Sequence, residues 1–424
     1  MPNQTVTILN WNIQNFGETK AGYADLVDGI AWRVVTANPI PDIFILIELN
    51  TSKEATAEYL SLKMATALNN QSNQINHRDE FKVYVLSPKT GRETYAFFIR
   101  DATRTRPLIP VDPATDQIPA GIGGVYKDEL TTVVFMESAL TGGLQLLNGF
   151  CLYLPDIEVT VSSEYEKKKV KARPSWPAVR VPVLGMFWCA TAKRLLPVVA
   201  CHFAAKHEDA KKQFDTLKYF KLMNGMAPSA GVGSAPKGIP AVQVKLIGQA
   251  KTNVTPGTYV LTGDFNVDYR NINEIADYSV IEGNVDPALA AGVENQTHDT
   301  LLMTYGTFKA QRPKKIEDFP NRDYDNFCLR VSPTAGFTVI RTDLSVYLTP
   351  FDIQDRRIKL DESVKDYAEL DKRGFISNEY ADLVVNFAKQ ITGDKSVKIN
   401  LTGALVGARL ISDHLPVTVT YTIT

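Results

Sequence analysis

Short apolar runs, rich in β-branched and aromatic residues, recur along the chain between more polar stretches. Runs of this length and composition predict β-strands. The predicted strands cover residues 6–13, 42–49, 81–86, 95–99, 196–203, 259–265, 327–331 and 417–423.

Apolar residues at helical spacing occupy the interval between the first two predicted strands. They are Tyr23, Leu26, Val27, Ile30, Ala31, Val34 and Val35, and the pattern stops before Pro39 and Pro41. This interval is predicted to be an amphipathic helix that joins two buried strands. Further helices are predicted at residues 52–68 and 209–223. Strands mixed with helices along the chain indicate an α/β or α+β layered fold.

Composition places the chain among ordinary globular proteins. Of its 424 residues, 44% are hydrophobic and 22% are charged, enough apolar material for one large domain or two smaller ones. The formal net charge is −1, so any affinity for phosphate depends on a local basic patch. Residues 164–173 and 312–315 are basic clusters that could contact phosphate, and the ordinary reading of such runs is a solvated surface.

The cysteines and the N-terminal residues bear on the cellular compartment of the protein. Cys151, Cys189, Cys201 and Cys328 lie far apart without a CxxC pair, so neither a zinc site nor a disulfide framework is expected. The N-terminus lacks the pattern of a secretory signal, and no apolar run is long enough to suggest a membrane span. We therefore expect a cytoplasmic protein.

Polar residues that can support catalysis stand at the ends of predicted strands or directly after them. In chain order they are Asn12 in LNWNIQNFG, Glu48 in FILIELN, His202 in VVACHF, Asp264 and Asn266 in VLTGDFN, and Asp413 and His414 in ISDHLPV. Open sheets deliver strand-end side chains to a common crevice. Taken singly, each has an ordinary reading as a turn former, a strand-end carboxylate or a hydrogen-bonded core histidine.

Together these residues supply what the hydrolysis of a phosphodiester requires. Carboxylate and amide oxygens bind a hard divalent cation, a base activates water, and donors stabilise the charge that develops on the phosphoryl group. The chain lacks GxSxG, GxxxxGKS/T and HExxH sequences, so no competing catalytic set is present. The residues alone indicate metal-dependent chemistry on a phosphodiester.

The ordered series NWN, LIEL, CHF, GDFN and SDHLP resembles the endonuclease/exonuclease/phosphatase superfamily and spans the chain from Asn12 to His414. The resemblance implies an α/β (α+β) fold: a four-layer sandwich of two packed, mainly antiparallel β-sheets flanked by helices, with the site at one edge. NFGETK at residues 15–20, GRETYAFFIR at 91–100 and YDNFCL at 324–329 are similar to segments of deoxyribonuclease I. The resemblance implies that the protein is a Mg²⁺-dependent nuclease that acts as an endonuclease on DNA.

The resemblance also implies how the metal and the phosphate are bound. Glu48 is expected to bind Mg²⁺, or Mn²⁺ in its place, with help from Asn12 and Asp413. Arg173 is similar to an arginine that contacts phosphate in this family. No segment of the sequence locates a calcium site.

The same resemblance implies two histidine–carboxylate pairs. Glu93 is expected to orient His202, and Asp325 is expected to orient His414, because a carboxylate fixes the tautomer of an imidazole and raises its basicity. One histidine then acts as the base and the other as an acid or charge stabiliser. In the same scheme, Asp264 and Asn266 position water and phosphate oxygens.

Departures from deoxyribonuclease I leave other substrates open. Asn50, two residues after Glu48, stands where that enzyme has an arginine that enters the DNA minor groove, so single strands, RNA and small phosphodiesters are alternatives. An inositol-phosphate or sphingomyelin-type phosphoesterase is a second reading. The evidence against it is that the PAWCDRI-like segment of inositol phosphatases is absent and YDNFCL takes its place. A catalytically inactive binding scaffold is a third, which the intact set of site residues disfavours.

The chain is longer than a typical domain of the resembled family, and the excess lies between the motifs. Intervals 101–171, 225–256, 268–321 and 333–409 are candidate insertions. Because motifs from both ends must meet in one site, we expect one enlarged domain over residues 1–424, with insertions that border the substrate groove.

Overall fold

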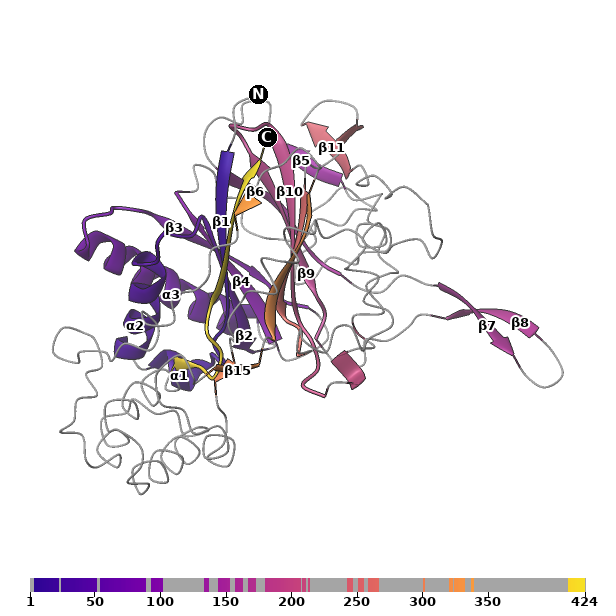
Figure 1. Cartoon of the computed structure of the whole chain (residues 1–424), viewed down its shortest axis with the longest axis horizontal. Helices are drawn as coiled ribbons and strands as arrows, with labels where there is room; N and C mark the ends of the chain where they lie inside the picture. The colour runs from indigo at the N-terminus through magenta and orange to yellow at the C-terminus, as the bar shows by residue number, and fades with distance from the viewer. Residues whose placement is uncertain are drawn as a thin grey trace, which may run out of the picture.

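The computed structural model of the protein describes residues 4–22, 24–51, 54–88, 93–101, 133–136, 144–152, 157–162, 167–172, 180–206, 208–210, 213, 242–246, 251–254, 258–266, 300–301, 320–322, 324–331, 337–338 and 411–423. Two large β-sheets face each other, and helices cover the outer face of the first sheet (Figure 1). Gln4 pairs with Ile423, so the two ends of the chain lie side by side in the same sheet.

The first sheet has 6 strands in the order β17-β18-β1-β2-β4-β3. They are β1 (Gln4–Asn12), β2 (Ile43–Asn50), β3 (Phe81–Leu86), β4 (Glu93–Arg100), β17 (Phe337–Thr338) and β18 (Val417–Ile423). Among the described strands of this sheet, only β1 and β2 are parallel neighbours. Parallel strands need a crossover connection, which α1 (Glu18–Gly22) and α2 (Ala24–Val35) provide. Helix α3 (Glu54–Gln74) follows β2 and packs against α2 and β3.

The second sheet has 5 strands in the order β16-β13-β10-β9-β6. They are β6 (Leu144–Cys151), β9 (Val183–Cys189), β10 (Arg194–His202), β13 (Thr258–Asp264) and β16 (Asp325–Val331). Within the part of this sheet that the structure describes, β10 and β13 are the only parallel neighbours. Each sheet is therefore mainly antiparallel, with a single parallel pair inside it.

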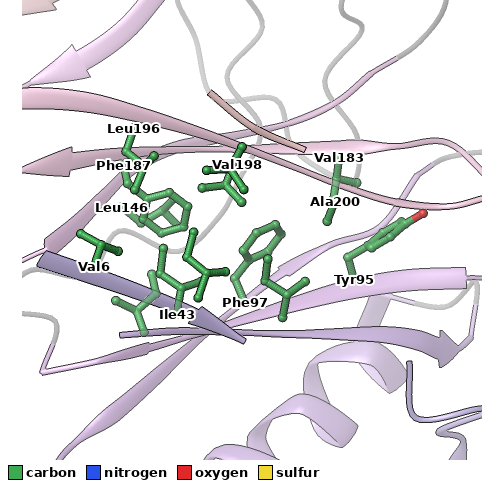
Figure 2. Close-up of a cluster of buried hydrophobic side chains, with 14 of the residues drawn as sticks. Val6, Ile43, Tyr95, Phe97, Leu146, Val183, Phe187, Leu196, Val198 and Ala200 are labelled. Atoms are coloured by element: carbon green, nitrogen blue, oxygen red, sulfur yellow. The ribbon is translucent and has the colours of Figure 1, made fainter. Parts of the chain in front are cut away.

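The two sheets bury an apolar core between them (Figure 2). Alternate residues of each strand point into it, because successive side chains of a strand lie on opposite faces. Ile43, Ile45 and Ile47 contribute from β2, and Phe97 contributes from β4. Phe44, between these positions, is equally buried on the opposite face. Burial on both faces explains the uninterrupted apolar run that the sequence shows in β2.

Three smaller sheets complete the described strands. One contains β5 (Val133–Met136), β11 (Val242–Leu246) and β12 (Lys251–Val254), and another pairs β14 (Thr300–Leu301) with β15 (Pro320–Arg322). The third pairs β7 (Ile157–Ser162) with β8 (Lys167–Ala172), and this ribbon projects away from the sandwich (Figure 1).

The predicted fold class is confirmed: two mixed sheets pack face to face, with helices against the first. Every predicted strand is present, and α2 and α3 match two predicted helices, although α3 extends to Gln74. Strands β6 and β9 complete the second sheet without having been predicted, and β6 lies within the interval 101–171.

Several predicted segments lie outside the described residues: most of the predicted helix at 209–223, the basic cluster at 312–315 and much of the four candidate insertions. Within the described part of the chain, no helix has the length and apolar character needed to span a membrane.

Candidate active site

Asn12 and Glu48 meet where the parallel strands β1 and β2 end. The register places Asn12 beside Ile47, and parallel strands end at the same edge of a sheet. A β-bulge between Leu46 and Leu49 shifts the pairing with β4, and Glu48 within it has a φ of 63°. Bulges re-aim side chains next to functional sites. Glu48 Oε1 accepts a hydrogen bond from Asn12 Nδ2 at 3.2 Å.

The chain makes a strained turn directly after β1. Gln14 and Asn15 have φ values of 24° and 52°, a left-handed region that costs roughly 1 kcal/mol or more for a residue with a Cβ. Within this turn, Gln14 N donates to Asn12 Oδ1 at 2.9 Å, and Asn15 N donates to Glu48 Oε2 at 2.7 Å. Backbone donors thus fix two of the three predicted metal ligands.

His202 and Asp264 end the parallel pair of the second sheet and are direct register partners. Gly263, just before Asp264, has a φ of 147°, and a Cβ at this position would lie 1.8 Å from the carbonyl oxygen of Cys201. Glycine alone permits so close an approach of β13 to β10. Asp264 Oδ1 accepts a hydrogen bond from the backbone nitrogen of Asn266, and Asp264 Oδ2 accepts one from Asn12 Nδ2, each at 2.9 Å. The second of these bonds links the two sheets at the site.

His202 is buried, and its ring nitrogens face different partners. Nδ1 lies 2.7 Å from Glu93 Oε2; His202 and Arg180 hold the pKa of Glu93 below its ordinary value against the effect of burial. Nε2 lies 2.7 Å from Arg180 Nη1, 3.2 Å from Glu48 Oε1 and 3.4 Å from Asp264 Oδ2. Burial lowers the pKa of His202, but the carboxylates of Glu93, Glu48 and Asp264 outweigh it and raise the pKa above its ordinary value. Arg180 can donate to Nε2 only while that nitrogen carries no proton.

His414 forms the second pair, with Asp325 at the start of β16. Nδ1 lies 2.5 Å from Asp325 Oδ2, and Nε2 lies 3.7 Å from both Asp264 Oδ2 and Asp413 Oδ1. Burial raises the pKa of Asp325 to about 6. The pKa of His414 stays well above its ordinary value despite burial, because Asp325, Asp264 and Asp413 surround it. Asp264 Oδ2 thus lies close to Nε2 of both histidines.

Other residues that the sequence did not single out support this second pair. Asn10 Nδ2 donates to Asp325 Oδ1 at 3.3 Å, and Trp11 Nε1 donates to the carbonyl oxygen of His414 at 2.9 Å. Ser412 Oγ donates to the carbonyl oxygen of Asn12 at 2.6 Å and accepts from His414 N at 3.0 Å. Asn10 lies two residues before Asn12 on the same strand face, so the two-residue period of LNWN is a signal that could have identified it.

Arg180 is a further residue of the site that sequence reasoning missed. Its Nε lies 2.9 Å from Glu93 Oε1, and its Nη1 donates to the carbonyl oxygen of Phe203 at 2.6 Å. Asn266 Nδ2 donates to the same carbonyl oxygen at 2.9 Å, so Arg180 and Asn266 converge. In the sequence, Arg180 stands in PAVRVP without any pattern that marks it as functional. Arg173, which the sequence did indicate, lies outside the described residues.

Two groups among the described residues could hold a metal ion. One is Glu48, Glu93 and His202, and the other is Asp264, Asp325 and His414. The predicted ligand Glu48 belongs to the first group, and Asp413 adjoins the second through its contact with His414. Largely buried carboxylates beside the amide of Asn12 provide oxygen donors, which hard divalent cations such as Mg²⁺ prefer. The donor set therefore fits the predicted metal.

No protein-family model matches this chain, and a comparison with curated proteins gives no match either. Among solved structures, an endonuclease/exonuclease/phosphatase family protein from Bacteroides thetaiotaomicron is 13% identical, with a TM-score of 0.43 over 100% of both chains. TDP2 from D. rerio, complexed with a single-strand DNA product, is 13% identical over 80% of this chain and 89% of that chain, with a TM-score of 0.39. A mannosyl-6-phosphatase from B. thetaiotaomicron is 16% identical over 79% and 88% of the two chains, with a TM-score of 0.36.

Proposed function

We propose that the protein is a Mg²⁺-dependent phosphodiesterase that hydrolyses nucleic acid, acting as a DNA endonuclease. The observation that supports this best is the arrangement of two histidine–carboxylate pairs, His202 with Glu93 and His414 with Asp325, around Asp264. The two Nε2 atoms lie 3.4 and 3.7 Å from Asp264 Oδ2. Two proton carriers beside one carboxylate suit a reaction that deprotonates water and protonates a leaving oxygen.

The donor atoms of the site suit a divalent cation. Glu48, Asp264 and Asp413 supply carboxylate oxygens, which are the ligands that hard divalent cations prefer. In the proposal, Glu48, Asn12 and Asp413 would hold Mg²⁺, and the bound ion would supply positive charge to offset the charge of the phosphate oxygens. The backbone nitrogens of Gln14 and Asn15 keep two of these ligands oriented before the metal binds.

The proton transfers are assigned to the two histidines. Asp264 and Asn266 position a water molecule, whose oxygen forms a bond to phosphorus. One imidazole accepts the proton of this water, and the other gives its proton to the oxygen released when the second phosphorus–oxygen bond breaks. Glu93 and Asp325 hold the two rings at their Nδ1 atoms, so each Nε2 faces the reacting groups.

Arg180 is proposed to contact the phosphate. Its guanidinium lies beside His202 Nε2, and a planar donor group of fixed charge suits phosphate oxygens better than a single ammonium does. Asn266, which bonds the same carbonyl oxygen as Arg180, places a second polar group next to it.

DNA as the substrate rests on the sequence similarity of residues 15–20, 91–100 and 324–329 to deoxyribonuclease I. Asn50 is exposed at the edge of the site, and its Nδ2 donates to Asn15 Oδ1 at 3.0 Å. This short side chain cannot reach into a duplex groove as an arginine does. We therefore include single-stranded DNA and RNA beside duplex DNA in the test below.

The test is a cleavage assay on supercoiled plasmid, linear duplex, single-stranded DNA, RNA and an inositol phosphate, each with Mg²⁺ or EDTA. We expect Mg²⁺-dependent nicking of the plasmid, and a loss of about 10²- to 10⁴-fold in His202→Gln, the usual contribution of acid–base catalysis. His77→Gln is the control, because His77 is an exposed residue that follows α3 and is not one of the site residues. Hydrolysis of the inositol phosphate alone would replace DNA with a small phosphoester. Full activity in His202→Gln, or in EDTA, would refute the mechanism.

A further inference from the structure

Lys20 is a buried cation behind the predicted metal ligands that the mechanism above does not use. Its Nζ donates to the carbonyl oxygen of Ile13 at 3.0 Å and to that of Gln14 at 2.9 Å. The residue is 3% exposed, although lysine is rarely buried in folded proteins. Burial of an ammonium group is costly unless partners compensate for the lost water, so its position calls for a physical reason.

The two carbonyl groups belong to the strained turn after β1. The peptide unit that carries the Ile13 carbonyl also carries the N–H of Gln14, and that N–H donates to Asn12 Oδ1 at 2.9 Å. The next peptide unit carries the Gln14 carbonyl and the N–H of Asn15, which donates to Glu48 Oε2 at 2.7 Å. Lys20 therefore binds, from the opposite side, both peptide units that hold the predicted ligands Asn12 and Glu48.

We propose that Lys20 is a positioning residue that clamps these two peptide units and so presets the cation site. This inference rests on the proposed metal site. A charge-assisted bond to a carbonyl oxygen polarises the peptide and strengthens the hydrogen bond that its N–H donates. It also opposes relaxation of Gln14 and Asn15, whose left-handed conformations are otherwise unfavourable.

The electrostatic surroundings agree with this geometry. Burial lowers the pKa of Lys20 to about 8, while Asp413 and Glu48 act in the opposite direction. Lys20 thus interacts with the two carboxylates predicted to bind Mg²⁺. A purely electrostatic role and a positioning role of Lys20 predict opposite changes in cation affinity when the lysine is removed. Loss of a nearby positive charge alone would strengthen the binding of a divalent cation, whereas loss of a positioning residue would weaken it.

The experiment measures Mn²⁺ affinity by electron paramagnetic resonance for the wild type, Lys20→Met, Lys20→Arg and Lys63→Met. Lys63 is the control, since its Nζ donates to the Ala21 carbonyl at 3.3 Å and does not bond the turn. We expect Lys20→Met to bind Mn²⁺ about 10- to 100-fold more weakly, as is typical when a residue that supports metal ligands is lost. Lys20→Arg, which keeps the charge and the donors, should bind more tightly than Lys20→Met. Tighter or unchanged Mn²⁺ binding in Lys20→Met would overturn the proposal.

Hydrogen exchange of the metal-free proteins gives a second readout that does not depend on metal binding. The amides of Gln14 and Asn15 should exchange faster in Lys20→Met than in the wild type or Lys63→Met, while the amides of β10 should be unchanged. Equal exchange in all three proteins would refute the clamp. If exchange at Gln14 and Asn15 supports the clamp but the wild type binds no Mn²⁺, the metal site of the proposed function is refuted. The proposal that Lys20 presets that site is then refuted as well. If Lys20→Met does not fold, Lys20→Arg decides the outcome. Mn²⁺ affinity and amide exchange close to those of the wild type support the clamp, and a loss of affinity of about tenfold or more in folded Lys20→Arg contradicts a role for charge and donors.

Discussion

The two sheets bring their residues to the same edge by different means. In the first sheet, Glu48 lies in a β-bulge and Asn12 precedes a turn with two left-handed residues. In the second sheet, His202 and Asp264 remain regular register partners, and the close strand approach is accommodated by Gly263. The first sheet thus loses its regular register where it supplies predicted metal ligands, and the second keeps its register where it supplies a histidine and a carboxylate.

The chemistry of the two sets accounts for this difference. Oxygen ligands must converge on one point. Glu48 follows Ile47, the register partner of Asn12, so in a regular strand pair the side chains of Asn12 and Glu48 would point to opposite faces. A proton carrier and the carboxylate beside it need only lie opposite each other on neighbouring strands. We therefore expect changes in the first sheet to impair metal binding in a folded protein, and changes in the backbone of the second sheet to impair folding.

The largest effect is expected from Gly263→Ala. A Cβ at this position would lie 1.8 Å from the Cys201 carbonyl oxygen, so β13 must separate from β10. We expect the free energy of unfolding to fall by about 4 kcal/mol or more, as for other severe backbone clashes, measured by urea denaturation. Gly22→Ala is the control, because a Cβ there meets nothing within 4 Å. A stability equal to that of the control would show that the second sheet tolerates distortion as the first does.

Glu48→Gln and Asp264→Asn should separate metal binding from the positioning of water. Both variants should fold, and each should lose about 100-fold in rate or more. We expect raised Mg²⁺ to restore part of the activity of Glu48→Gln only, because Asp264 is assigned to water rather than to the metal. Glu58→Gln, an exposed change on α3, serves as the control in a Mg²⁺ titration of the cleavage rate. Equal recovery of both variants would contradict the division between the sheets.

Arg180→Met should have a smaller effect. Its loss removes a phosphate donor and a partner of Glu93, so we expect a fall in kcat/KM of about tenfold, the value of one charge-assisted hydrogen bond. Arg180→Lys should recover only part of it, because an ammonium lacks the planar fork. Steady-state kinetics on plasmid DNA would show this, and an unchanged kcat/KM in Arg180→Met would remove the residue from the phosphate site.

The smallest effect concerns pH and stability. The pKa values of His202 and His414 are raised in the folded protein, so the native state retains protons that the unfolded chain releases near pH ~6.5. Their contribution is present below that pH and is lost as the pH rises through the folded pKa values. In EDTA, the free energy of unfolding should fall between pH ~6.5 and the folded pKa of Lys20 of about 8, above which Lys20 acts in the opposite direction. The double variant His202→Gln/His414→Gln should lose this slope. His77→Gln should keep the slope, and a flat wild-type profile would contradict the raised pKa values.

Much of the fold and part of the site could be predicted from local sequence. The apolar run of β2 and the polar residue that ends it are properties of neighbouring residues, so they identified a buried strand with Glu48 at its end. The resemblance of short motifs added Glu93 and Asp325 as expected partners of His202 and His414, and the structure places each pair in contact. Arg173 stays a prediction, because it lies outside the described residues.

The sequence by itself determined where eight of the described strands lie and which polar residues stand at or near their ends, because these depend on periodicity and on adjacent residues. Only the tertiary structure decided that Arg180 lies beside His202, that Asn10 supports Asp325, and that Lys20 lies behind the turn after β1. These contacts join residues through the pairing of strands and the packing of a helix, and spacing along the chain does not specify such convergence. The left-handed turn and the bulge at Glu48 were likewise decided by tertiary contacts, since neither contains the glycine that would have indicated them in the sequence.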